Sequence, residues 1–232
     1  MADLNFPSNP QVGDTYTIGT RTWIWNGNGW QIQSAITSLD PFTAKRVIVT
    51  TSTNATSTAT GGLVVYGGAG IAGNLVVGPG AITRNIKNAN IYSSGNFQYE
   101  GDAQVGFYIL RKELIAAVAS ALTTDSLVAG TTNQIIMPNN SAYSFKILVT
   151  AKAKTTNDEG AWEFNGIVSK GVGTSSVAIK VVNKTKIWSS NSAYDVNVIA
   201  DTTYGGLQVV ANGADTNPVR FVAKVETVEI TA

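Results

Sequence analysis

The chain has 232 residues, a formal net charge of +1, and neither cysteine nor histidine. Without these residue types it can have no disulfide, no thiolate zinc site, no thiol nucleophile and no Ser-His-Asp triad. The near-zero net charge argues against nucleic acid as a partner, because binding a polyanion needs a basic face. We expect no cofactor and no metal, although hydrolysis by paired carboxylates stays formally open.

The ends and the hydropathy pattern carry no targeting signal. Met1–Pro7 has neither the basic region nor the apolar region of a signal peptide. No run approaches the roughly 18 apolar residues that a transmembrane helix needs. We therefore expect a chain made in a cytoplasm, without membrane insertion.

Residues 1–33 are typical of a small β-hairpin module. Thr15–Ile18 and Thr22–Trp25 are strand-like on either side of Gly19-Thr20, and Asn26–Gly29 contains two Asn-Gly turn signals. Strand alternation would place Trp23 and Trp25 on one face, with Ile24 on the other.

The module holds three tryptophans within eight residues, more than a thirty-residue hairpin can bury alone. They must therefore pack on something. The first interpretation is a small aromatic core, the second a surface for attachment to identical chains or to another protein, and the third a platform for sugar rings. The candidate attachment or packing residues are Phe6, Tyr16, Trp23, Trp25 and Trp30.

Residues 34–104 are predicted to form a linker and then a Gly/Thr-rich β-shaft. After a break at Asp40-Pro41, Arg46–Thr50 is strand-like, and one phrase then occurs twice, as Gly62–Val65 and Asn74–Val77, 12 residues apart. Two short strands cannot bury a core by themselves. We expect the missing neighbours to come from identical chains, with three chains wound together.

The same stretch contains a misleading motif. Gly68–Gly73 fits the G-x-G-x-x-G pattern of dinucleotide-binding loops. That chemistry needs a helix to begin within the motif and an acidic residue about 20 positions later. Another strand and turn follow instead, and no Asp or Glu occurs from Pro41 to Tyr99. A structural role is the better interpretation.

Residues 105–232 are predicted to form an antiparallel β-sandwich. Apolar residues recur at intervals of four from Leu110 to Leu122, which predicts a helix over 110–121. From Thr123 onward, apolar and polar residues alternate in short strands separated by turns. In the last strand the apolar face switches, which predicts a β-bulge near Glu226-Thr227.

The acidic residues of this part are expected to be solvated. A glycoside hydrolase would need two carboxyl groups facing each other in a cleft, one of them desolvated. Glu163, Asp195, Glu226 and Glu229 are predicted on polar strand faces, and most of the other acids lie in turns. Asn157–Glu159 offers oxygens for calcium but lacks the spacing of a calcium loop.

Phrases along most of the chain resemble structural proteins of tailed phages, particularly fibres of phages that infect cyanobacteria. The N-terminal phrase resembles the attachment segments of tail fibres and other virion proteins, and its W-N-G-x-x-W part is also similar to chitin- and cellulose-binding modules. The matching residues are Phe6, Pro7, Pro10, Gly13, Tyr16, Thr17, Trp23, Trp25, Asn26, Gly27 and Trp30. The other matching phrases are 51–78, Met137–Phe145, Trp162–Gly166 and Asp201–Glu229.

The resemblance implies a mainly β, non-enzymatic virion protein: a short homotrimeric tail fibre or appendage. Its parts would be an attachment module at 1–33, a linker and shaft at 34–104, and a C-terminal knob at 105–232. In the resembling domains a strand occupies the stretch near 110–121, so a strand is the alternative to a helix there. The implied partners are copies of itself and other virion proteins of the tail or capsid. Alternative functions are a capsid-bound fibre or decoration protein, and an adhesin that binds a host surface glycan.

Overall fold

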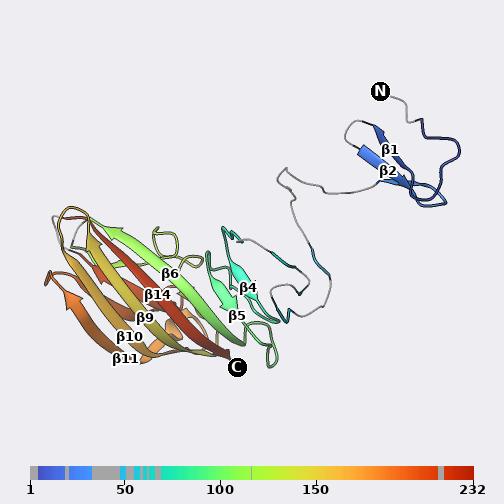
Figure 1. Cartoon of the computed structure of the whole chain (residues 1–232). Helices are drawn as coiled ribbons and strands as arrows, with labels where there is room; N and C mark the ends of the chain where they lie inside the picture. The colour runs from blue at the N-terminus through green and yellow to red at the C-terminus, as the bar shows by residue number, and fades with distance from the viewer. Residues whose placement is uncertain are drawn as a thin grey trace. The chain divides into compact units, whose positions relative to one another are not determined.

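The computed structural model describes residues 5–18, 21–32, 48–50, 55–57, 60–61, 63–65, 69–115, 117–213 and 217–232. The described part contains fourteen strands and one 3-10 turn, η1 (Thr174–Ser176), which confirms the mainly β prediction (Figure 1). It divides into two compact units, residues 1–68 and 69–232. No helix in the described part is long and apolar enough to cross a membrane.

The first unit holds a three-stranded antiparallel sheet of β1 (Thr15–Ile18), β2 (Arg21–Trp25) and β3 (Trp30–Ile32). The predicted Asn-Gly turn joins β2 to β3: the side-chain oxygen of Asn26 accepts hydrogen bonds from the backbone N–H of Asn28 and of Gly29, each at 2.9 Å. The hairpin prediction is confirmed. The expected features at Gly19-Thr20 and Asp40-Pro41 lie outside the described residues.

The second unit is built on a seven-stranded sheet, which Figure 1 shows face-on. Its strand order is β11-β10-β9-β14-β6-β5-β4, and every neighbouring pair is antiparallel except β4 with β5, which are parallel. The bounds are β4 (Leu75–Val77), β5 (Asn90–Tyr92), β6 (Ala103–Leu114), β9 (Ser141–Ala153), β10 (Glu159–Lys170), β11 (Ala178–Ser189) and β14 (Val219–Thr231).

A smaller sheet completes the sandwich, with strand order β12-β13-β7 and with β8 also paired to β13. Its bounds are β7 (Ser120–Ala121), β8 (Ile135–Ile136), β12 (Asp195–Asp201) and β13 (Gly206–Asn212). Both sheets contribute inward side chains to one buried apolar cluster. At its centre Phe221 of β14 has its ring centroid 6.3 Å from those of Trp162 and of Tyr194. The sandwich prediction is confirmed.

The prediction of a helix over 110–121 is wrong. Residues up to Leu114 belong to β6, which pairs with β14 along its whole length, and Ser120–Ala121 forms β7. An interval of four fits a strand, whose period is two, as well as a helix. The structure buries Leu110 and Leu114 but leaves Val118 66% exposed, so the stripe is not a helix face. The long partner strand β14 determines the conformation here.

The predicted β-bulge at Glu226-Thr227 is also wrong. β14 keeps one register with both neighbours from Val219 to its end. The strand continues its alternation, so Thr227 and Glu229 are buried while Val228 and Ile230 are exposed. Polar side chains therefore occupy the inner face, and apolar ones the outer face, at this end of the strand.

Within one chain, the described residues of the two copies of the repeated phrase do not pair with each other. Its second copy is β4, which joins the knob's sheet through β5 and β6. In the described part, the first copy, Leu63–Val65, belongs to no strand, and neither does Ile48–Thr50. Residues 69–104 thus belong to the C-terminal unit, and the division lies after Gly68 rather than after residue 104. The described residues of the G-x-G-x-x-G motif, 69–73, lead into strand β4 and not into a helix.

Candidate interaction surfaces

The five aromatic candidates come together in the first unit around Phe6. The Phe6 ring centroid lies 5.2 Å from that of Tyr16, 5.5 Å from that of Trp23 and 5.2 Å from that of Trp30, on which it stacks at 13°. Trp25 packs on Trp30, with ring centroids 5.7 Å apart. The N-terminal segment before β1 thus supplies the ring that covers the hairpin.

This packing favours the aromatic-core interpretation of the module. Trp23 is buried and the other four rings are half-buried, so none is displayed as an open platform. Phe6 covers one face of Trp30, which a stacked sugar would otherwise use. The cluster explains how a three-stranded sheet, too small for an ordinary core, is held together.

In the second unit, the outer face of the seven-stranded sheet carries an unusual line of apolar side chains. Directly opposed residues cross the sheet from one edge to the other, because each pairs with the next in register. We call this line the apolar row: Val77, Tyr92, Val105, Val228, Ser144, Ile167 and Val181. Only Ser144 is polar. The solvent face of an antiparallel sheet is normally polar, so this row calls for a partner.

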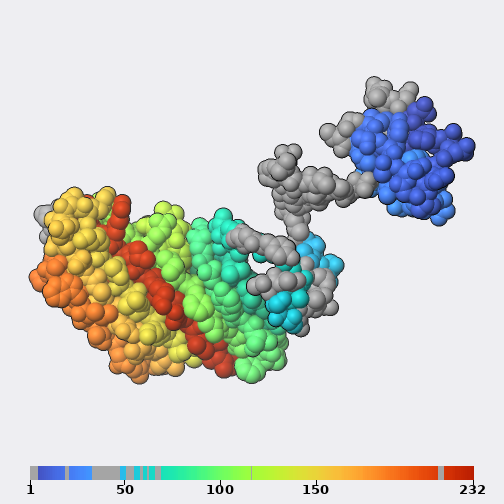
Figure 2. Space-filling view, in the orientation of Figure 1, coloured from blue at the N-terminus to red at the C-terminus, as the bar shows by residue number. Residues whose placement is uncertain are grey.

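The apolar row is open to solvent. Val228 at its middle is 61% exposed and Val181 at its end is 53% exposed. Figure 2 shows the face on which it lies, with β14 in red crossing between β9 and β6. A shallow hollow of about 310 Å³ lies beside Tyr92, Phe97 and Val228, and a second of about 250 Å³ lies between Val105 and Phe145.

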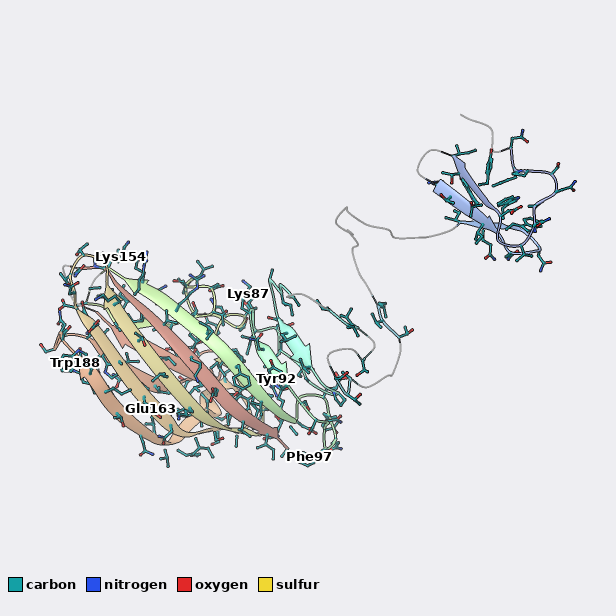
Figure 3. The ribbon with its side chains drawn as sticks, viewed as in Figure 1. Lys87, Tyr92, Phe97, Lys154, Glu163 and Trp188 are labelled. Carbon is teal, nitrogen blue, oxygen red and sulfur yellow. The ribbon has the colours of Figure 1, made fainter. Side chains whose placement is uncertain are left out.

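A rigid loop displays two more aromatic rings next to this face. The Asp102 carboxylate accepts backbone N–H bonds from Phe97 (2.9 Å), Gln98 (2.6 Å) and Tyr99 (2.7 Å). Burial by itself would raise the pKa of Asp102, but these donors hold it below its ordinary value. Phe97 remains 79% exposed (Figure 3). Tyr99 is 65% exposed. Aromatic rings on an ordered loop lose little entropy when a partner binds.

Several charges of the outer face are paired within the chain. Lys146 lies 3.3 Å from Glu163, and Lys224 lies 2.8 Å from Glu226. At the far end, hydrogen bonds from Arg220 and Lys154 lower the pKa of Glu113. The expectation of solvated acids is met at Glu163 and Glu226, and at Asp195, which pairs with Lys184 of β11 at 2.6 Å. The charges that flank the apolar row, those of Lys146, Glu163, Lys224 and Glu226, are therefore already paired.

Glu229 contradicts the expectation of a solvated face: its side chain is fully buried. Its carboxylate forms an ion pair with Arg84 and accepts hydrogen bonds from Gln104 (2.8 Å), Tyr108 (2.8 Å) and Thr227 (2.7 Å). The sequence contained a sign of this burial. Glu229 lies an even number of residues from Phe221, Ala223 and Val225, so in a regular strand its side chain points to the same inner face. Asp201 is buried as well, where it accepts bonds that hold the turn after β12.

The Glu229 network fastens residues 82–104 to the last strand. Arg84 also donates to the carbonyl oxygen of Gly101, while Gln104 exchanges two hydrogen bonds of 3.1 Å with the backbone of Ile82. The arrangement is closed to solvent at the carboxylate. Its evident role is to dock β4 and β5 onto the sandwich.

Tyr108 of this network and the buried Tyr143 make stability depend on pH. Burial, followed by the negative charge of Glu229, raises the pKa of Tyr108 and of Tyr143 well above 10. An unfolded tyrosine ionises near pH 10. Their contribution is therefore fully present below pH 10 and is lost as the pH rises from 10 through the folded-state pKa.

We expect Tyr143→Phe to change stability little at pH 8, because the Tyr143 hydroxyl makes no hydrogen bond in the described part of the chain. Above pH 10 the variant should lose stability less steeply than the parent. Urea unfolding at a series of pH values measures both slopes. Equal slopes would show that Tyr143 does not contribute to the alkaline loss.

No group of three or more Asp or Glu side chains in the described residues is arranged to hold a metal ion. At Asn157–Glu159, the Asp158 carboxylate accepts bonds from Thr156 (2.9 Å) and Asn191 (3.2 Å), and these bonds lower its pKa. Glu159 lies 3.5 Å from Lys152. The oxygens proposed for calcium thus have partners within the chain.

No protein-family model and no curated protein matches the sequence. Three solved structures of phage tailspikes are similar over part of the chain. The tailspike of Acinetobacter baumannii bacteriophage Fri1, a capsular polysaccharide depolymerase, matches 54% of this chain and 18% of its own, with 14% identity and a TM-score of 0.31. That of Acinetobacter baumannii phage AM24 matches 62% and 30%, with 10% identity and a TM-score of 0.27.

The tailspike of Acinetobacter phage vB_ApiP_P1 matches 60% of this chain and 24% of its own, with 14% identity and a TM-score of 0.22. The chain thus spans less than a third of each of these proteins. Similarities with TM-scores this low establish neither the fold nor the function of the chain.

Proposed function

We propose that the chain is a non-enzymatic structural component of a tailed-phage virion: a short homotrimeric tail fibre or appendage. The N-terminal module anchors it, and the C-terminal sandwich forms its outer knob. The sequence phrases that resemble phage fibres support this proposal. The second unit supports it as well. Its prominent exposed feature is the apolar row with paired charges beside it, and its buried Glu229–Arg84 network is closed to solvent.

The apolar row is the observation that carries the proposal. A long line of exposed valine, isoleucine and tyrosine on an otherwise ordered sheet is costly in water and is typical of a protein that works within an assembly. Its flanking charges are already paired, so a second copy could approach without leaving an uncompensated charge.

Val228→Lys is expected to weaken assembly, because it places a charge at the centre of the apolar row. The side chain is 61% exposed, so the fold should tolerate the change. Light scattering of the full chain should give about three times 24.3 kDa for the parent and a lower mass for the variant. Thr150→Lys, at an exposed site of the same face away from the apolar row, is the matched control and should assemble like the parent. A parent that stays monomeric at high concentration would contradict the proposed assembly.

Immunogold electron microscopy of virions from a phage that encodes the chain tests the function itself. Antibodies against the chain should label the tail. Label on the head would instead support the capsid-bound fibre or decoration protein. Absence of the chain from purified virions would overturn the structural role.

A further inference from the structure

The two edge strands of the seven-stranded sheet, β11 and β4, differ in how well they are protected from pairing with another chain. At one edge, β11 carries Lys180, Lys184 and Lys186, and its register with β10 shifts twice, around Lys180 and around Ile187. Lysines and irregular register are the usual means by which proteins keep an edge strand from pairing with another chain. The β11 edge is therefore blocked.

The other edge, β4, has no such protection. Leu75–Val77 contains no charge and no proline, and pairs with β5 without a shift. The Leu75 N–H donates to Ala89 at 3.1 Å and the Val77 carbonyl accepts from Ser93 at 3.0 Å, so these groups face β5. The N–H and C=O of Val76 must then face outward. Neither has a hydrogen-bond partner in the described part of the chain.

The chain contains a second segment of the same sequence. Leu63-Val64-Val65 repeats Leu75-Val76-Val77 with a spacing of 12 residues. In the structure it belongs to no strand, and Leu63 is 73% and Val65 50% exposed. The segment and the edge are complementary. Leu63–Val65 is an apolar, β-branched segment outside any described strand, and the β4 edge has backbone N–H and C=O groups that can pair with such a strand.

Parallel pairing of the two phrases within one chain is hindered by the short connection. Like-on-like stacking of the two phrases is parallel and in register, Leu beside Leu and Val beside Val. A parallel neighbour needs a crossover of about a dozen or more residues. Only the 9 residues 66–74 separate Val65 from Leu75. A second copy of the chain has no such limit.

We propose that Leu63–Val65 of one copy adds to the open edge of β4 in a second copy, as a parallel strand in register with it. The inference rests on the proposed homotrimer and names the contact that would link its chains. Because the donor segment and the acceptor edge are different surfaces, the contact runs head to tail. Repeated three times, the contact closes into a ring in which the β4 edge of each copy is covered by a strand of its neighbour.

The absence of cysteine from the chain permits a clean cross-linking test. Val65→Cys and Val77→Cys are placed on separate full-length chains with different tags, which are co-expressed and then oxidised. In-register neighbours have Cα atoms about 4.8 Å apart, within the range that a disulfide spans. We expect a disulfide that joins the two tags. Val65→Cys with Val181→Cys, an equally exposed site on the blocked edge, is the matched control and should not cross-link.

Other outcomes would contradict the strand exchange while leaving the proposed virion function intact. Chains that are trimeric and present in virions, but do not cross-link through residues 65 and 77, would overturn the strand exchange alone. The same holds if a single chain with both cysteines forms only an internal disulfide. Val65→Pro removes the N–H that the proposed register pairs with the Val76 carbonyl oxygen, at a residue outside any strand of the described structure. It should lower the mass measured by light scattering, and an unchanged trimer would also count against the exchange.

Discussion

Arg84→Met is expected to lower the free energy of unfolding of residues 69–232 by about 3–5 kcal/mol, as is usual when one partner of a buried ion pair is removed. The Glu229 carboxylate would remain fully buried beside Gln104 and Tyr108, but without its counter-charge. The carbonyl oxygen of Gly101 would lose a donor as well. Urea unfolding followed by far-UV circular dichroism measures the change.

The control is Arg220→Met, which breaks the exposed pair with Glu113. Exposed ion pairs contribute at most about 1 kcal/mol, so this variant should stay close to the parent. Adding Glu229→Gln to Arg84→Met should recover part of the loss, because it removes the uncompensated charge. Equal small effects of Arg84→Met and Arg220→Met would mean that the buried network does not hold the sheet together.

The sequence predicts well those elements whose pattern is local. The alternation from Phe145 to Ala153 lies within β9, and the Asn-Gly turn at Asn26 joins two real strands. In both cases the neighbours along the chain contain enough information, because a strand's two faces and a tight turn are decided within a few residues.

Where the partner lies far along the chain, the same patterns mislead. The spacing of Leu110 and Leu114 is compatible with a helix and with a strand. The segment forms a strand because it pairs with β14, which lies more than a hundred residues later in the chain. The switch of apolar face in β14 suggested a bulge. The strand instead keeps its register because Arg84, 145 residues away in sequence, pairs with Glu229 on the inner face.

The candidate surfaces divide in the same way. The aromatic cluster around Phe6 could be predicted because all its members lie within the first 33 residues and were too many for a bare hairpin. The apolar row could not be predicted. Val77, Val228 and Ile167 line up only when the order and register of seven strands are known. Each of them alone is an ordinary exposed residue.

Phe221→Ala should destabilise the sandwich by about 3–5 kcal/mol, the usual cost of truncating a buried phenylalanine. The side chain is fully buried and its ring contacts Trp162 from β10 and Tyr194 just before β12. It therefore joins the two sheets at the centre of the core. Thermal and urea unfolding of the full chain report the loss.

Phe97→Ala is the matched control, because the same truncation at a ring that is 79% exposed leaves no cavity. Its stability should lie within about 0.5 kcal/mol of the parent. The two variants thus distinguish two roles of an aromatic side chain. Phe221 should contribute to folding, and Phe97 should contribute to contacts that the folded chain makes with a partner. A Phe221→Ala chain as stable as the parent would contradict the packing of the two sheets on one core.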